Sequence, residues 1–453
     1  MLLLAVLAML TLTWWATSAW RAQSAPELTP TAQPRHVQAE PAVPARAAPI
    51  PPQAVAPALA ARTAASSASA TAVASPRTIA PPGKGQDVFD FCGRAPITMD
   101  EAMRRLPELE RDELRHRDEG RAARKRLAAA LLVGSEREQV VAALISGLDA
   151  VNAGKDLDTT PCPQPDVGSK CWSERFARQY SVLQPLRDRT VKLTLNSRDP
   201  WVYAVTARDL CSSLAAGAAP AESSCALLTP ELWRTRSPDD AAPSLWQAEL
   251  ALMRKEPAAV RDAMEQAARA GTLTSTVGLS LGPLMTHPAF TAMKPWHRNE
   301  LASELFALGS MPSLRSVVDH CTGDPMPAGV QRETCDKLVR LALQPGGSLV
   351  GHFVGTTLAK RLGWPADQVA LLEERKLALQ RQHRAALLPP DFMSCTGMAQ
   401  RQQYFAEVAA QGEAAALDAR IKASGRTVAQ LAAEARAEQA AVAATRAASA
   451  ASR

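Results

Sequence analysis

The sequence predicts an all-α fold built from antiparallel helical hairpins that disulfides hold together. Alanine and leucine supply much of a chain that is 47% hydrophobic but only 4% aromatic, and such residues favour helices over strands. Apolar residues recur at helical spacing through most of the chain, and all eight cysteines lie beyond residue 86. With 453 residues, the chain is long enough to bury a sizeable core.

Residues 1–21 are the first predicted element, a membrane-spanning helix. The first twenty residues carry no charged side chain and are long enough to cross the hydrocarbon core of a bilayer. Three tryptophans gather just before Arg21, and indole rings favour the membrane interface. An uncleaved anchor is therefore favoured. A signal peptide is the alternative, because Ala22 and Ser24 offer small residues near a cleavage point.

Residues 22–85 are predicted to be a disordered linker rich in proline and alanine. Twelve of the 34 prolines lie in this stretch, among Ala, Ser, Thr and Gln, and it holds too few large apolar side chains to form a core. Such a chain is semi-extended, so it would hold the folded part tens of ångströms from the membrane. A passive spacer is favoured over a proline-rich docking ligand.

A helical body is predicted over residues 86–395. A capping box, Thr98-x-x-Glu101, opens its first helix. The clearest hairpin lies within residues 237–271, where Pro257 suits the first turn of the second helix and Gly271 its end. The apolar face of the first helix consists of Leu245, Ala248 and Leu252, and that of the second helix consists of Val260, Met264 and Ala267. Further helices are expected over 135–150, 301–308, 366–379 and 428–444.

Paired short helices with small residues in the second helix resemble the tetratricopeptide-type and Sel1-like α-solenoid repeats. The resemblance is clearest over residues 237–271. Around Trp246 the family's Gly and Tyr are replaced by Leu250 and Met253, and no steady period of about 34 residues runs through the chain. The resemblance implies stacked hairpins and a protein-binding groove.

The eight cysteines are predicted to pair as disulfides. Residues 209–225 and 319–335 share the pattern D-x-C-x13-C, and each stretch reads as a helix, a loop and a second helix. A disulfide that closes a loop of this length stabilises the fold by about 3 kcal/mol, although spacing alone does not fix the connectivity. The predicted pairs are Cys211–Cys225, Cys321–Cys335, Cys162–Cys171 and Cys92–Cys395.

This use of cysteine predicts that the body lies outside the cytoplasm. Disulfides persist in oxidising compartments such as the bacterial periplasm. Arg21 and Arg35 follow the predicted anchor and favour the opposite orientation. The positive-inside rule is only a statistical bias in the number of basic residues, so the eight cysteines outweigh these two arginines. The chain is therefore expected to be a single-pass inner-membrane protein with a periplasmic body. Secretion into the periplasm after signal cleavage is the alternative.

One motif points to catalysis. Gly278-x-Ser280-x-Gly282 matches the nucleophile elbow of serine hydrolases, with Asp319 or Asp324 and His352 as triad partners in chain order. The elbow needs a strand before the serine, which the β-branched residues 272–277 could supply. The surrounding sequence predicts helical hairpins, however, and not the alternating strands of an α/β-hydrolase. Catalysis by Ser280 is therefore the alternative, and a non-catalytic protein is favoured.

Neither a bound metal, a cofactor nor nucleic acid is expected. A zinc site from His320, Cys321, Cys335 and His352 lacks the close ligand pairs of zinc-binding motifs. The densest basic run, residues 121–126, follows a stretch of alternating acidic and basic residues that is typical of a solvated helix face with ion pairs. It has no interleaved aromatic residues for base stacking.

Residues 396–453 are predicted to form C-terminal helices that end in a frayed, alanine-rich tail. Taken together, the sequence predicts a membrane-anchored periplasmic scaffold or protein-interaction module, whose partners are other envelope proteins. The alternative is an envelope serine hydrolase.

Overall fold

The computed structural model describes residues 88–89, 92, 97–98, 101, 104–157, 184–211, 223–309, 314–323, 327–389 and 391–451. The chain divides into two units, Met1–Gln86 and Asp87–Arg453, and every described residue belongs to the second. The predicted anchor and linker lie outside the described residues. Within the described ranges, no helix is both long enough and apolar enough to cross a bilayer.

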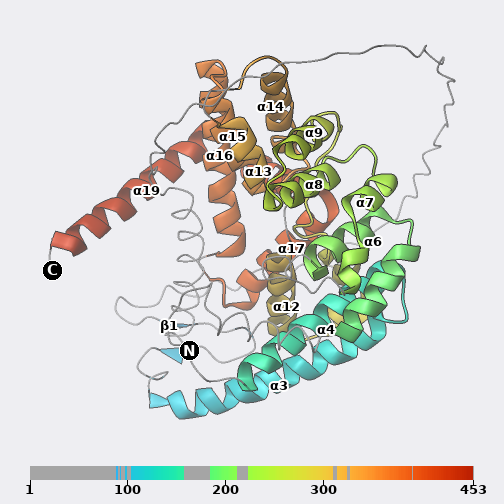
Figure 1. The fold of residues 1–453 in the computed structure, drawn as a ribbon. Coiled ribbons are helices and arrows are strands. Elements are labelled where there is room, and N and C mark those ends of the chain that lie inside the picture. The colour runs from blue at the N-terminus through green and yellow to red at the C-terminus, as the bar shows by residue number, and fades with distance from the viewer. Residues whose placement is uncertain are drawn as a thin grey trace, which may run out of the picture. The chain divides into compact units, whose positions relative to one another are not determined.

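The described residues of the second unit are helical, as predicted, apart from one small pair of strands (Figure 1). Strands β1 (Val88–Phe89) and β2 (Ile97–Thr98) are antiparallel, with Val88 opposite Thr98. The helices in the first part are α3 (Leu106–Leu131), α4 (Glu136–Leu157), an unlabelled helix over 184–196, α6 (Pro200–Val205), the π-helix η1 (Thr206–Cys211), the 3-10 helix η3 (Ser224–Leu227), α7 (Pro230–Arg236), α8 (Ala242–Met253) and α9 (Pro257–Ala267).

The later helices are α10 (Leu281–Met285), α11 (Pro288–Thr291), α12 (Pro295–Leu308), α13 (Arg315–Cys321), α14 (Gly329–Ala342), α15 (Leu349–Arg361), α16 (Ala366–Leu387), α17 (Cys395–Gln411), α18 (Glu413–Ala423) and α19 (Val428–Ala451). The predicted capping contact is present, because the Glu101 backbone N–H donates to Thr98 Oγ1 at 3.3 Å. Helix α3 itself begins five residues later, at Leu106.

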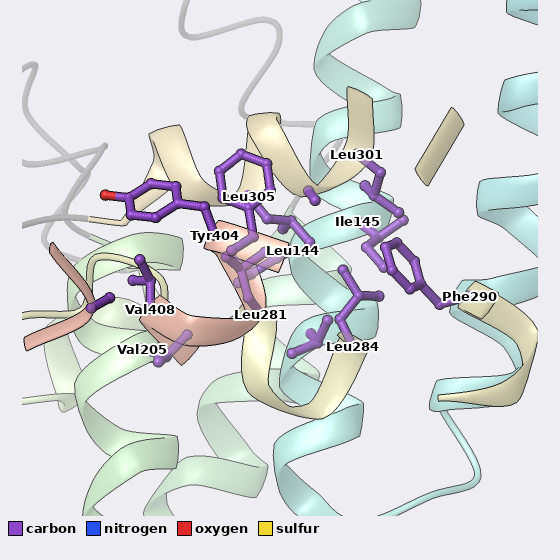
Figure 2. Close-up of a cluster of buried hydrophobic side chains, with 14 of the residues drawn as sticks. Leu144, Ile145, Val205, Leu281, Leu284, Phe290, Leu301, Leu305, Tyr404 and Val408 are labelled. Carbon is purple, nitrogen blue, oxygen red and sulfur yellow. The ribbon is translucent and has the colours of Figure 1, made fainter. Parts of the chain in front are cut away.

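One apolar core joins segments from both ends of this unit. Figure 2 shows side chains of α4, α10, α12 and α17 meeting in it. Tyr404 and Phe405 of α17 are fully buried beside Leu301 and Leu305 of α12. The first helices of the predicted C-terminal segment therefore share the core of the preceding body, while the second half of α19 is mostly exposed.

The predicted hairpin is helices α8 and α9, which pack against each other. Pro257 occupies the first turn of α9, and Lys255 in the connection has a positive φ of 58°. Five of the six predicted apolar residues face inward, wholly or in part. Leu252 is the exception, because it is 38% exposed and its neighbour Ala251 is buried instead. In the last turn of α8, the buried face is therefore centred one residue before the predicted position.

Three successive helix pairs stack on one another. Helices α8 and α9 contact α13 and α14, and α14 in turn contacts α15, which packs against α16. The segment 281–308 between the first two pairs leaves this stack, because its helices pack against α3, α4 and α17. The body is thus built from helical hairpins, with a long insertion between neighbouring pairs.

Three disulfides staple the described residues. Cys211–Cys225 and Cys321–Cys335 each have a Cα–Cα distance of 5.7 Å, and these are the pairs that the repeated spacing predicts. Cys92–Cys395 has a Cα–Cα distance of 4.3 Å. Beside it the Cys92 backbone N–H donates to the Met393 carbonyl at 2.9 Å. Cys162 and Cys171 lie outside the described residues.

Candidate functional site

The predicted nucleophile, Ser280, lies in the apolar core. Its side chain is fully buried and its hydroxyl donates to the Leu305 carbonyl at 3.5 Å. Residues 273–276 before it are irregular and form no strand, and the short helix α10 follows. The strand of a nucleophile elbow is therefore missing, although Gly278 has the positive φ, 76°, of a tight turn.

The proposed triad partners lie apart from Ser280. Asp319 is exposed on α13 and pairs with Arg315 at 3.6 Å, whereas His352 is buried in α15. Asp324 lies outside the described residues. In the part of the chain that the structure describes, Ser280, Asp319 and His352 share no hydrogen bond. These positions favour structural roles for all three residues.

His352 should make the fold sensitive to acid. Burial, assisted by the charge of Arg375, lowers the pKa of His352 to about 4, while an unfolded histidine titrates near about 6.5. The unfolded chain therefore binds a proton first as pH falls, and unfolding should become easier by about 3 kcal/mol between these two values. Urea unfolding at several pH values measures this. His352→Leu should flatten the fall, and an unchanged slope in that variant would contradict the prediction.

The zinc site considered in the sequence analysis would need two free cysteines. Cys321 and Cys335 are joined in a disulfide, so neither offers a thiolate. His320, next to this disulfide, is half-buried on α13, and burial lowers its pKa. With its two cysteines oxidised, this set retains only the two histidines as ligands.

The basic run contains a buried ion network, where a solvated face is predicted. The Arg124 guanidinium is buried and lies 2.7 Å from Glu304, 3.0 Å from Glu300 and 3.6 Å from Asp149. Burial raises the pKa of both Glu304 and Asp149 in spite of Arg124. The prediction was wrong for Arg124 because α12, far along the chain, covers this part of α3 and brings two of the three carboxylates.

A pocket of about 610 Å³ lies between α3 and the start of α12. Its floor is apolar, and its polar groups are the side chains of Glu119, Arg126, Lys294 and His297. The lining is completed by Ala122, Ala123, Leu127, Ala289, Ala292 and Met293. The pocket therefore combines an apolar wall with a few polar groups, as ligand sites in proteins commonly do.

Two histidines and a carboxylate form a cluster, and two of the three, Glu119 and His297, line this pocket. His116 and Glu119 lie one turn apart on α3, with His116 Nδ1 3.8 Å from Glu119 Oε2. His297 of α12 approaches them, and one ligand atom from each of the three residues lies within 4.8 Å of the others. Lys294 donates to Glu119 Oε2 at 2.5 Å and lowers the pKa of that carboxyl. Burial lowers the pKa of His297.

No family model, no curated protein and no solved structure matches this chain. The site is therefore interpreted from its own residues. Sequence reasoning missed it: His116-x-x-Glu119 is a weak local signal inside a charged helix, and no sequence signal connects it to His297.

Proposed function

We propose that the chain is a non-catalytic, single-pass inner-membrane protein of a bacterial envelope, whose helical body lies in the periplasm and binds other envelope proteins. The disulfides carry this proposal, because bonds such as Cys92–Cys395, Cys211–Cys225 and Cys321–Cys335 persist in oxidising compartments. In this proposal, residues 1–21 form the anchor and residues 22–85 the spacer that holds the body away from the bilayer.

The stack of helix pairs supports a role in protein binding. The pairs α8–α9, α13–α14 and α15–α16 pack in succession, and stacked pairs give α-solenoid proteins their extended binding surfaces. This is also what the resemblance to tetratricopeptide-type and Sel1-like repeats implies. The long insertion at 281–308 interrupts the stack, so the proposed surface would be irregular in shape.

Topology and capture experiments test the proposal. A reporter that works only outside the cytoplasm should be active when fused after Lys84, because the linker would then lie in the periplasm. A silent reporter there, with a cytoplasmic reporter active at the same site, would contradict the proposed compartment. Crosslinking in intact membranes, followed by mass identification, should recover specific envelope proteins with the unaltered chain.

Labelling with a fluorophosphonate probe distinguishes the proposed scaffold from the alternative, a serine hydrolase. A buried Ser280 should resist a fluorophosphonate probe, since its hydroxyl has no access to solvent. Covalent labelling of the unaltered chain that disappears in Ser280→Ala would overturn the non-catalytic proposal. Equal absence of labelling in both proteins is the expected result.

A further inference from the structure

The imidazole of His297 is buried without a hydrogen-bond partner. Its side chain is 3% exposed, and neither Nδ1 nor Nε2 has a partner in the structure. Buried polar side chains are almost always hydrogen-bonded. An imidazole that lies in a pocket wall and lacks a partner therefore points to a ligand that binds its ring nitrogen.

The backbone of α3 is built to let this imidazole approach. Gly120 faces the ring, and a Cβ at that position would lie 2.9 Å from His297 Nδ1. Any larger residue at 120 would push the ring away from α3. Glycine at this position therefore keeps His297 next to His116 and Glu119, which come from the same helix.

We propose that His116, Glu119 and His297 bind a divalent transition metal ion, and that Zn²⁺ suits the site best. Neutral imidazoles and an ionised carboxylate are common zinc ligands, and three protein ligands that leave one position open are typical of reactive zinc sites. Glu119 and His297 also line the pocket of about 610 Å³, so a water molecule or a small exogenous ligand from this pocket would complete the coordination.

The geometry needs only a small adjustment. Zinc lies about 2.0–2.1 Å from such ligands, which places tetrahedral ligand atoms roughly 3.3 Å apart. The three ligand atoms already lie within 4.8 Å of one another. His116 and Glu119 are 34% and 42% exposed, so their side chains are free to turn toward the more rigid His297.

Lys294 competes with the metal for Glu119. Its ammonium group lies 2.5 Å from Glu119 Oε2, but its side chain is 62% exposed and can swing into solvent. Binding therefore exchanges one cation for another at the same carboxylate. Removing the lysine charge should tighten metal binding, a result that a purely structural role for the cluster would not produce.

Metal titration of the full chain, after removal of adventitious metal with a chelator, tests the proposal. Equilibrium dialysis should show one tight Zn²⁺ per chain, and Co²⁺ should give the absorption bands of a tetrahedral nitrogen and oxygen site. His116→Gln, Glu119→Gln and His297→Gln should each weaken Zn²⁺ binding by more than about tenfold. Removing a residue that only hydrogen-bonds to a metal ligand already costs about tenfold or more in affinity, so removing the ligand itself should cost at least as much. Lys294→Met should tighten binding several-fold.

His320→Gln and Glu108→Gln are the matched controls, since both residues lie away from the pocket, and they should leave the affinity unchanged. Circular dichroism checks the fold of each variant. If His297→Gln does not fold, the half-exposed His116 decides the question. The proposal fails if the unaltered chain retains no Zn²⁺ at stoichiometric concentration, or if binding is as tight in His116→Gln as in His320→Gln. Loss of metal binding would leave the proposed scaffold role untouched.

Discussion

Replacing Cys92 and Cys395 together by alanine should lower the free energy of unfolding by about 5–6 kcal/mol, the largest loss for any described disulfide. The two residues are 303 positions apart, whereas each shorter pair spans 14. A disulfide restricts the unfolded chain more as the loop that it closes grows. Urea unfolding of the oxidised full chain at neutral pH measures the difference.

The shorter disulfides are the controls for this result. Removing Cys211–Cys225 or Cys321–Cys335 alone should cost about 3 kcal/mol and leave the other pair correctly formed. A loss for Cys92–Cys395 that is no larger than these would show that the long loop is already restrained in the unfolded chain. Peptide mapping without reduction checks the connectivity, and a bridge between Cys211 and Cys321 would contradict it.

Arg124→Met should destabilise the protein by about 2–4 kcal/mol, because it leaves partly buried carboxylates without their counter-ion. Glu304 and Asp149 remain beside the vacated position, and burial already raises the pKa of both. Without Arg124, the pKa of both carboxyl groups should rise further, so they should bind protons at a higher pH. The loss should therefore be largest at about pH 7 and shrink toward about pH 4.

Two further variants separate charge from packing at this site. Glu304→Gln added to Arg124→Met should recover part of the lost stability, since it removes one partly buried charge. Arg137→Met should cost less than about 1 kcal/mol, because Arg137 pairs with Asp199 but is 50% exposed. Chemical unfolding measures all three proteins. Equal losses for Arg124→Met and Arg137→Met would show that the buried network contributes no more than a surface pair.

Local signals in the sequence were sufficient to predict several of the helices. Pro257 marks the start of α9 because it lacks a backbone N–H, and the repeated cysteine spacing locates two helix–loop–helix corners. Periodicity was less reliable at helix ends. It assigned Leu252 to the buried face where the structure buries Ala251, because the last turn of a helix faces whichever neighbour the tertiary fold supplies.

Long-range packing could not be predicted in the same way. The sequence of α3 reads as a solvated, charged helix, and only the approach of α12 buries Arg124 and brings His297 to His116 and Glu119. Nothing in the sequence around His297 distinguishes it from an ordinary core histidine. For the same reason Ser280 matched a catalytic motif, although its environment in the fold is an apolar core.

The Cys92–Cys395 bond also sets how the protein carries mechanical load. Residues 93–394 lie inside a covalent ring that this bond closes. Tension between the amino-terminal segment and the carboxyl-terminal helices passes through the sulfur atoms directly into α17, and bypasses every helix from α3 to α16. If residues 1–21 anchor the chain as proposed, the body can be pulled without its hairpins being drawn apart, while reduction of this single bond would place all of them in the line of force.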